Sequence, residues 1–301
     1  MRIIGDTNIQ FVSRRRLFFV LSGLLMLASL AVIIVRGGFN YGVDFTGGSL
    51  VQLHFVQPVS TDAMRGVLEK MGEGGAGLQR DERGDFLIRA KAREFAGRET
   101  FSTKLSRQLG ESFPGNQYEI LRDEMVGPQV SKELQGKVLL AVLLGMLGIL
   151  VYVSFRFDLR FGTGAVLSLI HDTLITLGFV ALFNREVTIT VIAAVLTMIG
   201  YSVNDSIVVS DRIREDVRKM RKESFFDVCN QAINKNLSRT IVTSLTILFV
   251  TLALLVFGAA SIRDFAFVMT VGTIVGTYSS IFVVVNFVAE WEKKFPSKRR
   301  R

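Results

Sequence analysis

Six long apolar segments divide this chain, and each is close to the length that crosses a lipid bilayer. They are residues 17–35, 138–155, 161–183, 187–209, 240–262 and 265–289. Because a helix rises about 1.5 Å per residue, about 20 apolar residues cross about 30 Å of hydrocarbon. A soluble chain with the same 49% of hydrophobic residues would disperse them along amphipathic elements. The segments predict a multi-pass α-helical membrane protein with six transmembrane helices.

The first apolar segment is preceded by basic residues like a signal peptide, but it lacks the short length and cleavage site of one. It follows Arg14, Arg15 and Arg16, as a signal peptide does. It is longer than the roughly 15 residues of a removable segment, and Arg36 follows it directly, without small residues before it. We therefore expect it to remain as a transmembrane helix.

The basic residues lie at the ends of the apolar segments, so the net charge of +9 favours a membrane protein over a nucleic-acid binder. Short loops that carry Lys and Arg remain on the cytoplasmic side of a membrane. Only Arg185 and Arg263 occupy the short loops of one side. The other side holds Arg14–Arg16, Arg156, Arg160, a cluster over 212–222 and a tail over 293–301. We expect both termini to be cytoplasmic.

This orientation divides the chain into four regions. Residues 1–36 hold the cytoplasmic N-terminus and the first helix, 37–136 an extracytoplasmic domain, 137–289 helices two to six, and 290–301 a basic cytoplasmic tail. Within 37–136 the pattern predicts strands at 49–56, 77–80, 86–90 and 118–121 and helices at 61–71, capped by Thr61 or Asp62, and 94–109. The order β-α-β-β-α-β is that of a small ferredoxin-like α+β domain.

Residues 210–238 are predicted to form a cytoplasmic connection with an amphipathic helix. Its apolar face is Phe225, Phe226, Val228, Cys229, Ala232 and Ile233, opposite Asp227, Asn230, Gln231 and Asn234. The helix is expected on the membrane or against the bundle, and a binding site for a soluble partner is the alternative. Cys229 is the one cysteine, so the sequence offers no internal disulfide framework and no metal cluster, and we expect an inert thiol.

Several polar residues interrupt the later apolar segments. An ionisable side chain at the centre of a membrane helix costs at least about 2.5–3.5 kcal/mol, so it needs a partner, water or a function. Asp205 is the clearest case. The polar residues around it in sequence are Tyr201, Ser202, Asn204 and Ser206; the third segment has His171 and the stripe Ser168, Asp172, Thr176; the fifth has Arg239, Thr243 and Thr246.

These stripes predict a proton relay in the bundle interior, formed by Asp205, Arg239, Asn204, Tyr201, Asp172 and His171. A desolvated carboxylate near an arginine can be poised to bind and release a proton. The alternative is an Asp205–Arg239 ion pair that orders two helices, with the polar groups of the third segment serving in packing. Gly272 and Gly276 predict close helix packing in the last segment, as do the following Ser279 and Ser280.

Four stretches of the chain resemble the SecF family of bacterial protein export. Residues 41–48 read YGVDFTGG and residues 200–215 read GYSVNDSIVVSDRIRE. Residues 171–178 hold HD and ITLG, and residues 238–244 hold SRTI and TS. Members of this family are the smaller of the paired SecD and SecF subunits and belong to the resistance-nodulation-division type of transporter. The resemblance covers nearly the whole chain.

The resemblance implies a non-enzymatic subunit of the bacterial cytoplasmic (inner) membrane. With SecD it would use the proton-motive force to promote late-stage translocation of unfolded preproteins, alongside SecA, the SecY-SecE-SecG channel and YajC. Asp205 and Arg239 match the family's membrane-embedded charged positions linked to proton flow. No nucleic acid, metal or cofactor is implied.

Three other functions fit parts of the sequence. A half-transporter for a small molecule or lipid would need a deep apolar pocket in its outer portion, whereas this outer domain is small and charged. A purely structural subunit would use Asp205 and Arg239 to hold helices together. An intramembrane protease is disfavoured, because Ser168 and His171 lie three residues apart on one helix with no nucleophile motif.

Overall fold

The computed structural model describes residues 7–80, 84–91, 100–219 and 223–296. The chain forms two compact units. The membrane unit comprises Met1–Asn40, Ala141–Gly258 and Ile262–Arg301, and the sheet unit comprises Tyr41–Leu140 with Ala259–Ser261. The predicted helix over 94–109, the connection over 210–238 and the tail over 290–301 each lie partly outside the described residues.

Six helical segments are long and apolar enough to cross a membrane, which confirms the six predicted spans. The last span is not one regular helix, because a π-helical turn, η2, separates α9 from α10. The elements are η1 (Val12–Arg14), α1 (Arg15–Val35), α5 (Pro128–Arg156), α6 (Leu159–Leu182), α7 (Ile189–Lys219), α8 (Phe225–Phe257), α9 (Ala260–Ser279), η2 (Ser280–Val284) and α10 (Val285–Lys294), with two short strands, β1 (Asn40–Tyr41) and β6 (Glu186–Val187).

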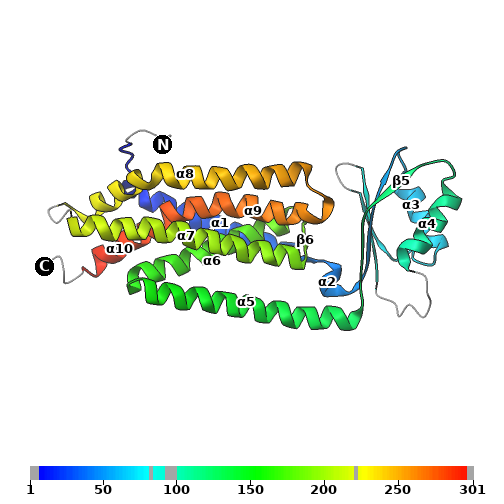
Figure 1. Ribbon diagram of the computed structural model, residues 1–301, viewed down its shortest axis with the longest axis horizontal. Helices are drawn as coiled ribbons and strands as arrows, with labels where there is room; N and C mark the ends of the chain where they lie inside the picture. The colour runs from blue at the N-terminus through cyan, green and yellow to red at the C-terminus, as the bar shows by residue number, and fades with distance from the viewer. Residues whose placement is uncertain (1–6, 81–83, 92–99, 220–222, 297–301) are drawn as a thin grey trace. The chain divides into compact units, whose positions relative to one another are not determined.

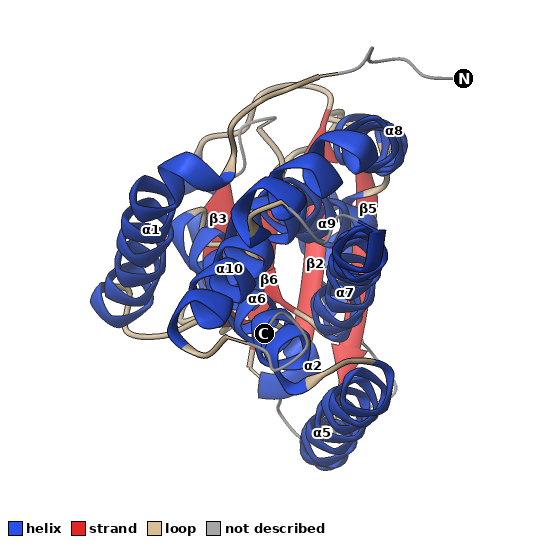
Figure 2. Ribbon diagram, turned by 90° about the vertical axis from the view of Figure 1, so that its left-hand side faces the viewer, coloured by secondary structure: helices blue, strands red, loops and turns tan. Residues whose placement is uncertain are grey.

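The helices of the membrane unit differ in how much of their surface they bury. In the end-on view of Figure 2, α6 and α10 lie in the middle of the bundle, and α1 and α5 lie at its edges. Leu24 on α1, Leu143 on α5 and Phe249 on α8 are exposed, as expected for side chains that face lipid or another subunit. Polar residues of α6 and α7 are instead buried in the bundle, among them Asp172 and Asp205.

The predicted cytoplasmic connection is not a separate helix. Helix α7 continues to Lys219, and α8 begins at Phe225 and runs into the fifth span without a break. The Ser224 hydroxyl caps α8 by accepting a hydrogen bond from the Asp227 amide at 3.1 Å. The predicted apolar face is buried against the bundle through Phe225, Cys229, Ala232 and Ile233. The helices extend beyond the predicted spans because charged side chains end an apolar run but do not interrupt the backbone hydrogen bonds of a helix.

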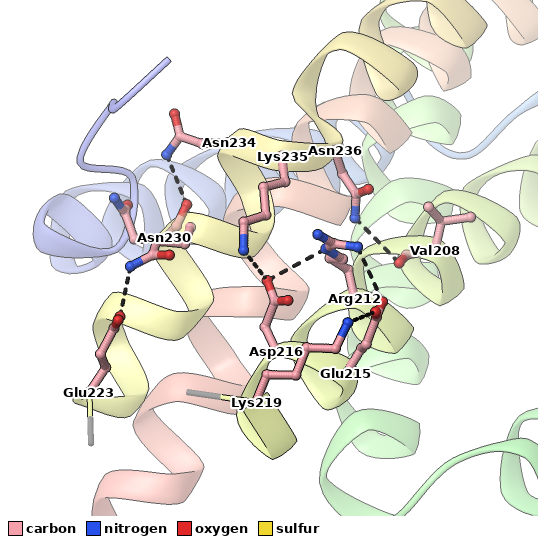
Figure 3. Close-up of polar contacts among 11 residues, drawn as sticks. Val208, Arg212, Glu215, Asp216, Lys219, Glu223, Asn230, Asn234, Lys235 and Asn236 are labelled. Atoms are coloured by element: carbon pink, nitrogen blue, oxygen red, sulfur yellow. Dashed lines mark hydrogen bonds and ion pairs between the residues drawn. The ribbon is translucent and has the colours of Figure 1, made fainter. Parts of the chain in front are cut away.

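An ion pair between Asp216 and Lys235 joins α7 to α8 next to this connection (Figure 3). Asp216 is only 2% exposed, and its carboxylate lies 3.0 Å from Lys235 Nζ and 3.5 Å from Arg212 Nε. Asn234 exchanges two hydrogen bonds of 2.9 Å with the backbone of Ile9, which holds the N-terminal segment on α8. Further ion pairs at this end are Arg15–Glu290, Arg156–Asp211 and Arg160–Glu292. The charged residues excluded from the spans therefore fix the helix ends to one another.

The sheet unit confirms the predicted β-α-β-β-α-β order. Its four-stranded antiparallel sheet has the order β3-β4-β2-β5, and α3 and α4 lie on the same side of it (Figure 1). The elements are α2 (Val43–Thr46), β2 (Gly48–Phe55), α3 (Thr61–Lys70), β3 (Gly77–Arg80), β4 (Phe86–Ala90), α4 (Phe101–Ser112) and β5 (Tyr118–Val126). The core between sheet and helices includes Leu53, Met64, Phe86, Ile88 and Leu105.

Three details of this unit differ from the prediction. The cap of α3 is Ser60, not Thr61 or Asp62, because the Ser60 hydroxyl accepts from the Ala63 amide at 3.1 Å. Strand β5 extends five residues beyond the predicted end at 121, since the charged side chains of Arg122 and Glu124 pair at 2.8 Å on the strand. Helix α4 begins at Phe101, and the predicted start at 94 lies outside the described residues.

Candidate functional site

Asp205 lies on α7 with its side chain turned into the bundle, where it is 7% exposed. Its carboxylate accepts two hydrogen bonds from hydroxyl groups of neighbouring elements. Thr240 of α8 donates to Oδ1 at 3.2 Å, and Ser280 of η2 donates to Oδ2 at 2.6 Å. Three elements therefore meet at this acid.

Asp172 on α6 is a second buried acid and has no solvent exposure. Its Oδ2 accepts from Ser202 of α7 and, at 2.7 Å, from Ser279 of α9. His171 Nδ1 lies 2.8 Å from its Oδ1, within hydrogen-bond distance. Ser168 donates to Ser279 at 2.9 Å and completes a hydroxyl cluster around the acid.

The two acids share their supporting elements. Ser202 and Asp205 lie one turn apart on α7, and Ser279 and Ser280 are consecutive at the junction of α9 and η2. Close approach of α9 to α7 makes this possible, because a methyl group at Gly276 would lie 3.2 Å from the Ser202 Cβ. A methyl group at Gly272 would overlap with the Met198 side chain, which confirms the close packing predicted for both glycines.

Tyr201 extends the polar interior toward α8. Its hydroxyl lies 2.8 Å from Ser244 Oγ, and Thr277 of α9 donates to the same oxygen at 2.7 Å. The inward face of α8 is therefore formed by Thr240 and Ser244, both buried.

The polar stripe predicted to line the bundle interior lies on the exposed face of α8, so this prediction is wrong. Thr243 and Thr246 are exposed, and their hydroxyls donate to carbonyls of their own helix at 2.9 and 2.8 Å. Arg239 and Asn204 are exposed too. In the part of the chain that the structure describes, hydroxyls and not Arg239 contact the Asp205 carboxylate, so the predicted relay is only partly brought together.

His171 connects the acid cluster to α1 through an aromatic ring. Its imidazole stacks on Tyr278 with ring centroids 5.9 Å apart and planes inclined by 24°. The Tyr278 hydroxyl lies 3.0 Å from Ser22 Oγ and donates to the Phe18 carbonyl at 3.2 Å. Among the described residues, buried His171 Nε2 has no hydrogen-bond partner.

Sequence reasoning missed the hydroxyl donors of the last span. Thr277, Tyr278, Ser279 and Ser280 all contribute to the site, whereas the sequence pattern predicted only a packing role for the serines. The available signal was four consecutive hydroxyl side chains in an otherwise apolar span.

Fold and site together define a multi-pass membrane protein that carries two buried acids in a hydroxyl-lined bundle interior, as proton-coupled transport proteins do. Two families match this chain. The family described as protein export membrane protein SecD/SecF, C-terminal, matches residues 106–294, and the SecD/SecF GG motif matches residues 32–59. The chain belongs to the SecD/SecF family of protein export membrane proteins, which confirms the resemblance seen in the sequence.

Relatives of this chain bear the name protein translocase subunit SecF. That of Calditerrivibrio nitroreducens is 42% identical over 289 residues and covers 95% of both chains. That of Escherichia coli O157:H7 is 40% identical over 88% of this chain and 82% of its own. A crystal structure of SecDF from Thermus thermophilus, described as a translocon-associated membrane protein, superposes with a TM-score of 0.83 at 38% identity. This chain covers 39% of that longer chain, and 96% of this chain is matched.

Proposed function

We propose that this chain is the SecF subunit of a bacterial protein translocase and acts with SecD to drive late-stage preprotein translocation by the proton-motive force. The observation that carries the proposal is Asp205, a carboxylate inside a membrane bundle whose contacts are hydroxyl groups. Hydroxyls can donate to the carboxylate and accept from the carboxylic acid, so the site tolerates both protonation states. A fixed ion pair would favour only the charged one.

The cycle needs only proton binding and release by the chain's own residues. A proton from the extracytoplasmic side converts the Asp205 carboxylate to the acid, and loss of the same proton to the cytoplasm regenerates it. Asp172, His171 and Tyr201 supply further polar groups along the interior, and Arg239 and Asn204 would join them when their helix faces turn inward. Protonation turns the Asp205 carboxyl group into a hydrogen-bond donor. The helices that carry the surrounding hydroxyl groups then change their packing.

The energy available per proton fits a conformational step. One charge that crosses about 100 mV releases roughly 2.3 kcal/mol, and one pH unit adds about 1.4 kcal/mol. Together these shift a two-state equilibrium several hundredfold. Many cycles would be needed to move a long polypeptide.

SecD is the partner supported by the family, since SecD and SecF portions occur in the single SecDF chain of Thermus thermophilus. We extend the proposal to the SecY-SecE-SecG channel, SecA, YajC and an unfolded preprotein, which a translocase subunit of this kind would serve. The lipid bilayer surrounds the exposed faces of α1, α5 and α8, except where SecD covers them.

We expect that preprotein export driven by a proton gradient requires this chain, and import into membrane vesicles tests this. Inverted membrane vesicles with SecD alone and with SecD plus this chain would be compared for preprotein import, each with and without a protonophore. Only the vesicles that hold both subunits should show an additional, protonophore-sensitive component. Equal import by both kinds of vesicle would contradict the proposed function.

We also propose that both termini are cytoplasmic and the sheet unit is extracytoplasmic, because basic residues gather at one end of the spans. In a Cys229→Ala background, Glu111→Cys in the sheet unit should react with an impermeant maleimide in intact spheroplasts. Glu215→Cys near the end of α7 should react only after permeabilisation. Both positions are exposed, so burial does not bias the comparison. The reverse pattern would show that the orientation is wrong.

A further inference from the structure

The last membrane span contains a π-helical turn at the depth of the two buried acids. Helix α9 ends at Ser279, and η2 begins at Ser280 and continues to Val284. The hydrogen bonds of a π-helical turn join residues i and i+5 instead of i and i+4, and such turns occur frequently at functional sites. Here it begins at the residue that contacts Asp205.

Consecutive side chains on this span contact different acids. Neighbouring residues of a helix point about 100° apart, so adjacent serines can face two different helices. Ser279 donates to Asp172 of α6 at 2.7 Å, and Ser280 donates to Asp205 of α7 at 2.6 Å. Both serines have no solvent exposure. One peptide unit therefore separates the donors of the two acids.

Each of these serines has a second acceptor within reach. Ser279 Oγ lies 3.1 Å from the Gly276 carbonyl, and Ser280 Oγ lies 3.1 Å from the Thr277 carbonyl. A serine hydroxyl carries a single hydrogen, so it donates either to the carboxylate or to the carbonyl of its own helix. When an acid takes up a proton it becomes a donor itself, and the serine hydrogen is released to the carbonyl.

Other charged or titratable groups face the two acids from the surrounding helices. They are His171 from α6, Tyr201 from α7 and Tyr278 from α9, whereas Arg239 of α8 is exposed. Helix α1 contributes the Ser22 hydroxyl, which contacts Tyr278, whereas the α10 carboxylates Glu290 and Glu292 pair with Arg15 and Arg160 at the helix ends. Ser279 contacts Asp172 and Ser280 contacts Asp205, so two consecutive residues of one backbone reach both acids.

We propose that Ser279 and Ser280 are positioning residues that couple the two buried acids, so that protonation of Asp205 changes the proton affinity of Asp172 through the π-helical turn. The proposal deepens the proposed proton-driven function and rests on it. Rotation of the Ser280 hydroxyl toward Thr277 loosens η2, and the adjacent Ser279 changes its donation to Asp172. The pair of acids then titrates as a coupled unit.

The coupling is measured by an infrared titration of the protonated carboxyl groups in the purified complex with SecD, reconstituted in lipid. The Asp172 band is assigned by its loss in Asp172→Asn. Asp205→Asn should move the titration midpoint of Asp172 by about half a pH unit or more when both serines are present. With Ser279→Ala and Ser280→Ala together, the same Asp205→Asn substitution should move it by less than about half as much.

Control variants separate coupling from damage to the fold. Ser280→Thr keeps a hydroxyl and should retain the full shift, and Thr246→Ala removes an exposed hydroxyl and should retain it too. If the double alanine variant does not fold, Ser279→Ala and Ser280→Ala are titrated singly. An equal shift with and without the serines, or an Asp172 band that does not titrate, overturns the proposal.

The outcome is distinguishable from failure of the proposed function. Loss of gradient-dependent export in Asp205→Asn together with an unchanged shift in the alanine variants would leave the function standing and remove the serine coupling. Unchanged export in Asp205→Asn would instead remove the function on which the coupling rests.

Discussion

Replacing Asp205 with asparagine is expected to abolish the gradient-dependent part of preprotein export and to leave the gradient-independent part intact. Asparagine has nearly the same size as aspartate. Its amide oxygen can accept from one of the two hydroxyls, Thr240 or Ser280, and its amide nitrogen can donate to the other hydroxyl oxygen, so the bundle should assemble with SecD. It cannot bind and release a proton at physiological pH. The measurement is import into inverted vesicles at equal expression, with and without a proton gradient.

A matched substitution on the same helix provides the control. Asp211 lies near the end of α7 in ion pairs with Arg156 and Arg214, and its side chain is 36% exposed. Because such exposed pairs contribute about 0–1 kcal/mol, Asp211→Asn should keep the gradient-dependent export. If Asp205→Asn also keeps it, Asp205 is a structural residue and the bundle interior does not carry the driving proton.

The sequence predicted the elements of this protein better than the faces that they present. Spans and strands follow from apolar runs and alternation, which depend on local composition. Helix α8 shows the limit, because Arg239, Thr243 and Thr246 form as regular a polar stripe as Thr240 and Ser244. A shift of one residue turns the helix face by about 100°, and only packing against α7 and α9 decides which stripe is buried.

The hydrogen-bond donors of the candidate site could not be predicted from the sequence for a related reason. Asp205 and Asp172 could be singled out because an acid in an apolar span is costly. Hydroxyl groups carry no such cost, since a serine or threonine can bond to its own helix, as Thr243 and Thr246 do. The roles of Ser279 and Ser280 therefore became visible only once α6, α7 and the π-helical turn were placed together.

The largest effect on stability is expected from enlarging Gly178 on α6. A methyl group at this position would overlap with the Ser29 side chain of α1 and lie 2.8 Å from the Ser29 Cα. Because the obstacle includes backbone, a rotamer change cannot relieve the overlap, and α1 must move away from α6. Overpacking of this kind costs about 1–3 kcal/mol or more, so Gly178→Val should lower the melting temperature in detergent by about 4–10 °C.

Two further variants test whether the overlap with α1 is the cause. Gly200→Ala on α7 adds a methyl group where no atom lies within 4 Å, and it should leave the melting temperature within about 2 °C of the unmodified protein. Ser29→Gly removes the side chain that Gly178→Val meets, so the double variant should recover part of the loss, since the two residues are in contact. Additive effects of Gly178→Val and Ser29→Gly would show that the α1–α6 contact is not what limits stability. Partial recovery would show that the small residues Ser29 of α1 and Gly178 of α6 set the distance between these helices.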